Sequence, residues 1–133
     1  MVDREALFAQ YESAIVSARD PDVADDAAAW SDPALFSVLR QASCAVLTAW
    51  NPGFLRPGDA VNARRNAQLR ARLVLSGYEV WPALGASPDG AFSEPGFLAW
   101  EISLDEAVFI ARGFDQFAIY WYDETGERSV VAC

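Results

Sequence analysis

The stretch Cys44-Ala45-Val46-Leu47-Thr48-Ala49-Trp50-Asn51-Pro52-Gly53 decides the fold. Its first seven residues form a short apolar run, and Asn51-Pro52-Gly53 closes that run with turn-forming residues. This pattern predicts a buried strand followed by a turn. Pro57-Gly58-Asp59 then opens a helix that runs to about Ser76, where Gly77 ends it. The chain therefore enters its core as a strand followed by a helix.

The residues after this helix complete a recognisable order of elements. A long loop over 85–96 is predicted from its two turn signals, and Ser103-Leu104-Asp105-Glu106 is a capping box that starts a helix. Strands are predicted over residues 78–84, 97–102, 116–122 and 128–132. The order β-α-β-β-α-β with one extra strand is the ferredoxin-like, split βαβ pattern. Right-handed crossovers predict an α+β fold with an antiparallel sheet of about five strands, in the order 5-4-1-3-2, and both helices on one face.

The segment before the core has a helical pattern. Leu7, Phe8, Tyr11 and Ile15 recur at helical spacing and predict an amphipathic helix over residues 3–18. Asp32 followed by Pro33 predicts the start of a second helix that stops near Ala42. We therefore expect residues 1–43 to be an N-terminal helical extension packed on a core of residues 44–133, forming one domain in all.

Composition limits the class of the protein. The 133 residues are 53% hydrophobic, enough for one domain with its own core. The net charge of −9 argues against nucleic-acid binding, because affinity for phosphates needs positive potential. The apolar runs are too short to span a membrane, and the first five residues lack the order of a secretory signal, so a cytoplasmic location is expected.

Two residue types are missing from the chain. There is no histidine, and all ten basic residues are arginine. The sequence therefore excludes a Ser-His or Cys-His nucleophile pair, imidazole metal ligands and a lysine Schiff base. Any catalysis must use carboxylates, hydroxyl groups, Cys44 or a metal held by carboxylates, and we expect neither a cofactor nor a metal.

Asn62 and Asn66 are an anomaly in the helix over 59–76. They lie on the same stripe as Leu69 and Leu73, which marks the buried side of the helix, and Arg65 lies at its border. An inward amide without a partner costs roughly 1–3 kcal/mol. The two amides therefore either bond a neighbouring loop or line a pocket.

In a ferredoxin-like layout, several polar segments meet at one end of the sheet. They are the end of the first strand, the start of the first helix, the loop between the second and third strands, and the start of the fourth strand. The candidate ligand-binding residues at this end are Thr48, Trp50, Asn51, Asn62, Arg65, Asn66, Asp89, Glu94 and Gln116. In the alternative interpretation, the helix residues only anchor the long loop through Asp89 and Glu94.

The same positions carry a resemblance to a known family. The motifs are Thr48-Ala49-Trp50-Asn51-Pro52, Asn62-x-x-Arg65-Asn66-x-x-Leu69 with Leu73 and Gly77, Pro82-x-x-Gly85 with Pro88-Asp89-Gly90, Glu94-Pro95-x-Phe97-Leu98, and Phe114-x-Gln116. In this order they resemble the bacterial family called domain of unknown function 3293, over roughly residues 44–121. The chain departs from that family at Phe117, where asparagine is usual, and in its long acidic N-terminal segment. The resemblance implies no activity, substrate or cofactor.

Two hypotheses about function follow. The first is a non-catalytic binding or regulatory module that recognises a protein or a small polar ligand at the Asn/Arg/Asp end of the sheet. The second is a small enzyme that uses Asp89 or Glu94 as acid or base, with Arg65 holding an anionic substrate. A carboxylate with a raised pKa in a pocket beside Arg65 would favour the enzyme, and a self-satisfied polar cluster would favour the binding module.

The charges are unevenly distributed along the chain. Residues 1–32 carry a net charge of −6, whereas residues 56–72 carry a net charge of +4. Opposite fields attract, so the acidic segment is expected beside the arginine-rich helix, either within the chain or in a homodimer. In the alternative arrangement both segments face water.

Overall fold

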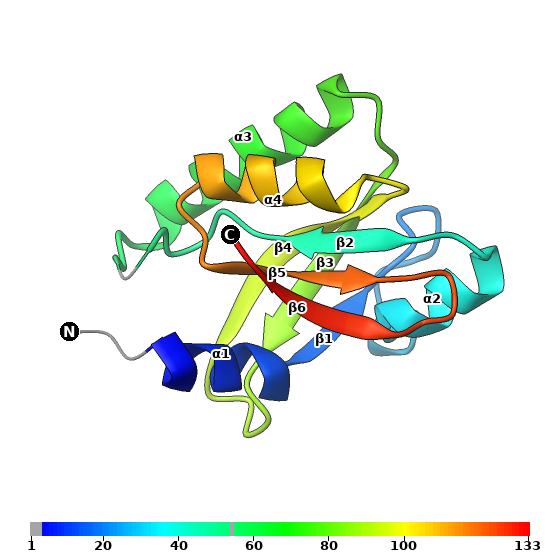
Figure 1. The fold of residues 1–133 in the computed structure, drawn as a ribbon, viewed down its shortest axis with the longest axis horizontal. Helices are drawn as coiled ribbons and strands as arrows, with labels where there is room; N and C mark the ends of the chain where they lie inside the picture. Colours follow the sequence, from blue (N-terminus) through cyan, green and yellow to red (C-terminus); the bar gives the residue numbers. More distant parts are fainter. Residues whose placement is uncertain (1–3, 54) are drawn as a thin grey trace.

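The computed structural model describes residues 4–53 and 55–133, and within them the chain forms four α-helices and six strands (Figure 1). A 3-10 turn over Ala27–Ala29 lies between the first strand and the second helix. The elements in chain order are α1 (Arg4–Ser13), β1 (Ile15–Ala18), α2 (Pro33–Arg40), β2 (Cys44–Leu47), α3 (Asp59–Leu75), β3 (Val80–Ala86), β4 (Ser93–Trp100), α4 (Leu104–Gly113), β5 (Ala118–Tyr122) and β6 (Arg128–Ala132).

The strands form one curled antiparallel sheet in the order β1-β3-β4-β2-β5-β6. The predicted α+β class and antiparallel sheet are confirmed, and the predicted first and third strands, β2 and β4, are neighbours. The predicted number of about five strands is one short, because β1 adds a sixth at the free edge of β3. The other five strands keep their predicted neighbours, but 5-4-1-3-2 does not describe the whole sheet.

Strand β1 corrects the prediction of one helix over 3–18. Helix α1 ends at Ser13, and the next residues alternate instead, with Val16 and Ala18 buried and Ile15 exposed. Val16 lies opposite Gly85 of β3, and Ala18 lies opposite Ala83. The open edge of β3 offers hydrogen bonds to any extended segment, and this pairing outweighs the helical spacing of the side chains. The second helix begins as predicted, because Asp32 accepts a hydrogen bond from the backbone of Ala34.

Helices α3 and α4 cover one face of the sheet, as the sequence predicted (Figure 1). Helix α3 contributes Leu69 and Leu73, and α4 contributes Ile110 and Ala111. These side chains are buried against strand residues that include Leu47 and Ile119. The two helices therefore hold the strands from one side only.

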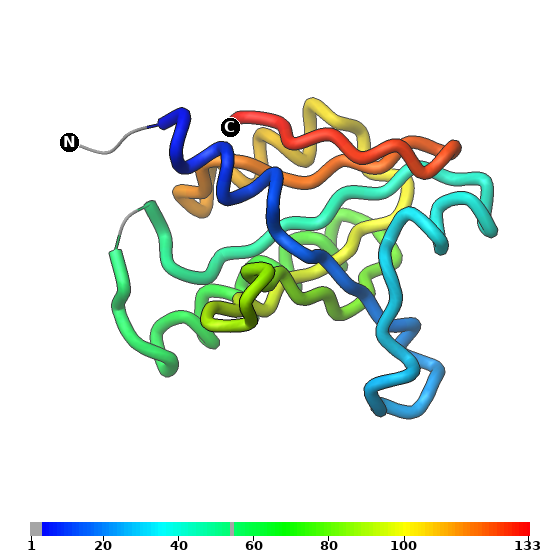
Figure 2. The backbone as a smooth tube through the Cα atoms, turned by 90° about the horizontal axis from the view of Figure 1, so that it is seen from below, coloured from blue at the N-terminus to red at the C-terminus, as the bar shows by residue number. Residues whose placement is uncertain are grey.

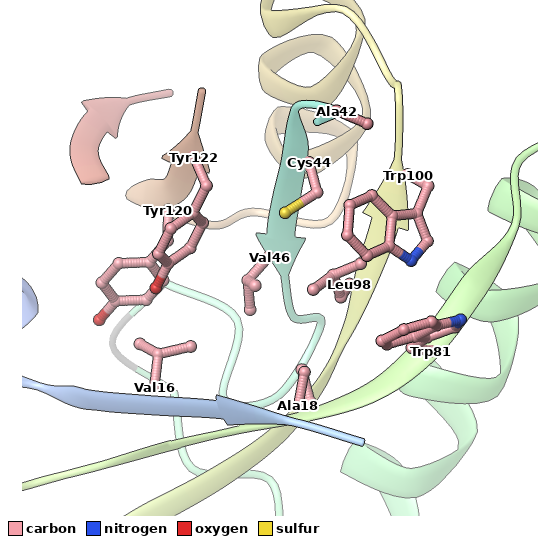
Figure 3. Packing of buried hydrophobic residues seen from close by; sticks show 11 residues of the cluster. Val16, Ala18, Ala42, Cys44, Val46, Trp81, Leu98, Trp100, Tyr120 and Tyr122 are labelled. Carbon is pink, nitrogen blue, oxygen red and sulfur yellow. The ribbon is translucent and has the colours of Figure 1, made fainter. Parts of the chain in front are cut away.

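The other face of the sheet is concave and holds a second core, shown in Figure 3. Trp81 and Trp100 meet edge to face, with ring centroids 5.2 Å apart, and Leu98 packs in the same cluster. Phe36 of α2 packs on Trp81 at one end of this core, where the centroids are 4.9 Å apart. Tyr120 points into the same concavity from β5 (Figure 3).

The N-terminal segment joins the two edges of the curled sheet. Helix α1 contacts β6, and the chain then runs to the opposite edge, where β1 pairs with β3 (Figure 2). Arg128 of β6 fixes α1 by donating hydrogen bonds to the carbonyl oxygens of Glu12 and Ala14. The segment is therefore part of the wall around the concave face.

The predicted long loop over 85–96 is half strand, at its two ends. Strand β3 continues to Ala86 and β4 begins at Ser93, so only residues 87–92 connect them. Gly85 lies opposite Glu94 in this hairpin. Among the residues that the structure describes, no helix is both long and apolar enough to cross a membrane.

Candidate functional site

The two buried asparagines of α3 use their side-chain hydrogen bonds to hold the segment that follows β2. Asn62 and Asn66 are 2% and 6% exposed, which confirms the predicted helix phase. Asn62 Oδ1 accepts from the backbone of Asn51, and Asn62 Nδ2 donates to Asn51 Oδ1, both at 2.8 Å. Asn66 Oδ1 accepts from the backbone of Ala49 at 2.8 Å, and its Nδ2 donates to the carbonyl of Pro95 at 2.9 Å. Both amides therefore fasten the ends of β2 and β4 to the helix.

Arg65 has a similar fastening role. Its guanidinium donates to the carbonyl oxygens of Phe114 at 2.8 Å and Ala49 at 3.3 Å, and it lies 3.7 Å from the Asp115 carboxylate. The side chain is 25% exposed and does not line the cleft described below. Holding an anionic substrate would require breaking these bonds, so the geometry does not favour that role for Arg65.

An open cleft of about 1120 Å³ lies beside this polar cluster, at the open end of the concave face. Its walls come from α1, from the segment between β2 and α3, and from the hairpin of β3 and β4. Seven of the nine predicted site residues line it: Thr48, Trp50, Asn51, Asn62, Asp89, Glu94 and Gln116. Arg65 and Asn66 stand behind this wall and support it.

Glu94 is the acidic group held inside the cleft. It lies on the same face of β4 as Leu98 and Trp100, so it points toward the concave side of the sheet. Glu94 Oε1 accepts a hydrogen bond from Asn51 Nδ2 at 3.2 Å. Burial raises the pKa of this carboxyl group, and the bond from Asn51 and the charge of Arg56 oppose that shift. Asn62, Asn51 and Glu94 thus form one chain of hydrogen bonds from α3 into the cleft.

Small residues around Glu94 explain why no side chain fills the space of the cleft. Gly85 lies opposite Glu94, and Ala83 lies opposite Gly96. Ala118 is two residues before Tyr120 on β5 and shares its face. A Cβ atom at Gly85 would meet no atom within 4 Å. The aromatic packing at the other end of the concave face therefore gives way to open space here.

Two tyrosines that the sequence did not mark as site residues also line the cleft. Tyr11 of α1 and Tyr120 of β5 have ring centroids 5.9 Å apart. Burial raises the pKa of Tyr120 to about 12, and burial with the nearby Glu94 raises the pKa of Tyr11 above its usual range. Both hydroxyl groups are therefore neutral at physiological pH. Tyr11 belonged to an apolar helical stripe, and its spacing gave no signal that it faces an opening.

The remaining predicted residues mostly shape the walls. Thr48 Oγ1 donates to the carbonyl of Pro95 at 2.7 Å and accepts from the backbone of Trp50 at 3.0 Å. Gln116 Nε2 donates to the carbonyl oxygens of Phe114 at 3.2 Å and Trp50 at 3.4 Å. These contacts fix the loop that carries Asn51.

Asp89 behaves differently from Glu94. It is fully exposed at the tip of the hairpin, where it accepts hydrogen bonds from the backbone of Ala91 and the hydroxyl group of Ser87. These bonds hold the pKa of its carboxyl group below the ordinary value. Asp89 therefore caps the turn and stays ionised, and it lacks the environment of a general acid.

Other reactive groups lie away from the cleft. Cys44 is buried in the concave core, and burial raises the pKa of its thiol to about 12, so it is not a thiolate nucleophile. In residues 4–53 and 55–133, no group of three or more His, Cys, Asp or Glu side chains is arranged to hold a metal ion.

Comparison with known proteins gives one match. The model of a family described as protein of unknown function (DUF3293) matches residues 47–119, more than half of the chain. No curated protein and no solved structure shows significant similarity to the chain. The matched range contains α3, the hairpin and most of the cleft residues, although α1 and Tyr120 lie outside it. The chain belongs to the DUF3293 family, as its motifs indicated.

Proposed function

We propose that this member of the DUF3293 family is a non-catalytic binding domain that recognises a small polar organic molecule in its cleft. The observation that carries the proposal is Glu94, a half-buried carboxylate held by Asn51 in the wall of a cleft of about 1120 Å³. A cleft of this size fits a small organic molecule, and a few placed polar groups among apolar walls are typical of ligand sites.

The polar groups around the cleft favour binding over catalysis. Asn62, Thr48 and Gln116 are engaged with backbone groups or with Asn51, so they set the shape of the site. The two tyrosine hydroxyl groups stay protonated and can donate or accept hydrogen bonds without acting as bases at neutral pH. Glu94 differs from these neutral groups, because it is a carboxyl group whose pKa is raised by burial.

The second candidate is an acid–base enzyme with Glu94 as its catalytic group. The raised pKa of Glu94 favours it, because a carboxyl group that binds its proton more tightly can act as a general acid. Arg65 and Asp89 do not support it, since one is bonded to backbone carbonyls and the other caps an exposed turn. Arg56, at the cleft, would be the cation available to an anionic substrate.

The proposal also covers the location and the partners of the protein. We expect the domain to act in the cytoplasm, with a small ligand as its partner rather than nucleic acid, which its net charge of −9 would repel. A protein partner or a homodimer remains compatible with this function, provided that the partner leaves the cleft open.

Fragment binding followed by NMR tests the proposed function. A panel of small amines, carboxamides, carboxylates and sugars is titrated into the labelled protein, and the backbone amide shifts are mapped. We expect at least one class to move the resonances of Tyr11, Asn51 and Glu94. Gly85→Leu should abolish the response by filling the cleft. Gly113→Leu is the control and should preserve the response, because Gly113 does not line the cleft. A Cβ atom at either glycine meets no atom within 4 Å.

Responses spread over other surfaces, or unchanged by Gly85→Leu, would contradict a function based on this cleft. The enzyme would be favoured instead if a bound fragment were chemically converted by the wild type and not by Glu94→Gln.

A further inference from the structure

We infer, resting on the proposed binding function, that the molecule bound in the cleft carries a protonated nitrogen, an ammonium or guanidinium group. This group would bind the Glu94 carboxylate and lie beside the side chains of Tyr11 and Tyr120. The inference specifies the chemical class of the ligand, which the proposed function leaves open.

Glu94 has no partner of opposite charge in an ion pair within the described residues. Among the described residues, the ion pairs are Arg19–Asp25, Arg40–Glu79 and Arg65–Asp115, and none includes Glu94. Arg56 also lines the cleft, and its charge lowers the pKa of Glu94, but it forms no ion pair with that carboxylate. Its guanidinium lies over the exposed ring of Phe92, 5.5 Å from the centroid. A carboxylate that is partly removed from water needs a compensating charge or hydrogen bonds. A cationic ligand would supply both.

The hydrogen bonds that the described residues form around Glu94 leave one of its two carboxylate oxygens open to a donor. Asn51 is fixed by Asn62 through two bonds of 2.8 Å, and it donates to Glu94 Oε1 only. The other carboxylate oxygen makes no hydrogen bond within residues 4–53 and 55–133. An ionised carboxylate only accepts hydrogen bonds, so a ligand that binds this oxygen has to bring a donor. An anionic ligand would meet a like charge here.

Two aromatic side chains, Tyr11 and Tyr120, lie near the carboxylate in the cleft. Glu94 lies close enough to both Tyr11 and Tyr120 for its charge to raise their pKa values. Neither hydroxyl group is hydrogen-bonded within the described residues, and the faces of such rings attract cations. Arg128 lies 5.1 Å from the ring centroid of Tyr120, but its guanidinium is committed to the carbonyl oxygens of Glu12 and Ala14.

Three probes of equal length test the inference: n-butylammonium, butyramide and butyrate. Each is titrated into the wild type at pH 7.5, and the dissociation constant is measured from the amide shifts of residues 11, 51, 94 and 120. We expect butylammonium to bind at least about tenfold more tightly than butyramide, a difference of ~1.4 kcal/mol. Butyrate should bind most weakly.

Two variants separate the role of Glu94 from a general effect of charge. Glu94→Gln keeps the shape of the side chain and should weaken butylammonium binding by about tenfold or more. Glu124→Gln makes the same change of charge at an exposed position in the β5–β6 turn, outside the cleft, and should leave binding unchanged. An intact amide spectrum shows that each variant is folded.

The outcomes distinguish the inference from the function beneath it. Butyramide or butyrate binding in the cleft as tightly as butylammonium would overturn the cationic ligand but keep the binding function. Equal losses for Glu94→Gln and Glu124→Gln would also overturn it. If no probe and no fragment of the wider panel moved the cleft resonances, the proposed function itself would fail.

Discussion

At Gly96 the backbone of β4 passes so close to β2 that the chain has no room for a methyl group. A Cβ atom there would lie 2.4 Å from the carbonyl oxygen of Leu47 and 3.2 Å from Cβ of Thr48. Gly85, in the neighbouring strand, has no atom within 4 Å of the same position. Two glycines of one hairpin therefore have opposite reasons for their identity: one permits a close contact, and the other leaves space.

We predict that Gly96→Ala lowers the free energy of unfolding by about 1–3 kcal/mol, because the inserted methyl group forces β2 and β4 apart. Gly85→Ala is the matched control, and it should be neutral or slightly stabilising, since alanine restricts the unfolded chain more than glycine does. Urea denaturation of the three proteins measures both effects. Equal stabilities of the two variants would show that β2 and β4 are not in this contact.

Glu94 should make stability depend on pH. Burial raises the pKa of its carboxyl group in the folded protein above that of the unfolded chain, so the folded state binds the proton more tightly. Its contribution to stability is therefore greatest at pH values below the unfolded pKa. That contribution is lost as the pH rises through the folded pKa.

We predict that Glu94→Gln is more stable than the wild type at pH 7.5, with the difference disappearing as the pH falls below the ordinary carboxyl pKa. Thermal unfolding over pH 3.5 to 8 measures this. Asp89→Asn should behave in the opposite way, because hydrogen bonds lower the pKa of Asp89 and stabilise its ionised form. A constant difference between wild type and Glu94→Gln across the range would contradict the environment described for Glu94.

Local rules predicted some site residues better than others. Asn62 and Asn66 were identified because an amide on a leucine stripe conflicts with the helical pattern, and both are buried and bonded as expected. Tyr11 conflicts with no pattern, and its place in the cleft depends on where β1 carries the chain. Arg65 was correctly placed near the cluster, but the backbone carbonyls that engage it could not be identified from sequence.

Among the elements, those with their own end signals were predicted closely. Asp32 and Ser103 cap α2 and α4, and each accepts a hydrogen bond from a backbone N–H of the first turn. The errors fall where an element depends on a distant partner. Strand β1 exists because β3 offers a free edge, and the hairpin extends past Gly85 because β3 and β4 pair with each other. Periodicity within one segment carries no information about such an edge.

Helix α1 has no fully buried residue, so its own side chains give it little anchoring by burial. Its position therefore depends on contacts with other elements. Arg128 holds it through the carbonyl oxygens of Glu12 and Ala14. We predict that Arg128→Met speeds amide hydrogen exchange in residues 4–13 by about tenfold, equivalent to losing hydrogen bonds worth ~1.4 kcal/mol. Exchange in α3 should change little. The exposed Arg72→Met is the control, and a similar effect from it would show that Arg128 has no special role.

For the whole molecule, the curled sheet is the feature that unites fold and site. Its concave face is filled by Trp81, Trp100 and Tyr122 at one end and left open beside Glu94 at the other. The charges of the chain do not explain this arrangement: α1 contacts β6, and no ion pair among the described residues joins the acidic segment to α3. The expectation that charge positions the acidic segment therefore has no support within the chain.

Two truncations should have different effects on the assembly. Deleting residues 1–13 removes α1 and leaves the sheet complete, so the protein should remain soluble in its original state of association. Deleting residues 1–19 also removes β1, which exposes the edge of β3 and the core around Val16, and we predict aggregation. Sedimentation velocity at low and high salt distinguishes these results. Identical behaviour of the two truncations would show that β1 does not protect the sheet.

The open space above Gly85 has a consequence for how such a protein can diversify. A Cβ atom there meets no atom within 4 Å, and Gly85 has no backbone conformation that only glycine adopts, so the backbone accepts a side chain at this position. The capacity of the cleft can therefore change by one substitution while Asn62, Asn51 and Glu94 keep their geometry. Under the proposed function, relatives sharing the fold would bind ligands that differ in size and share a cationic group. A library at this single codon would give a laboratory the same adjustment.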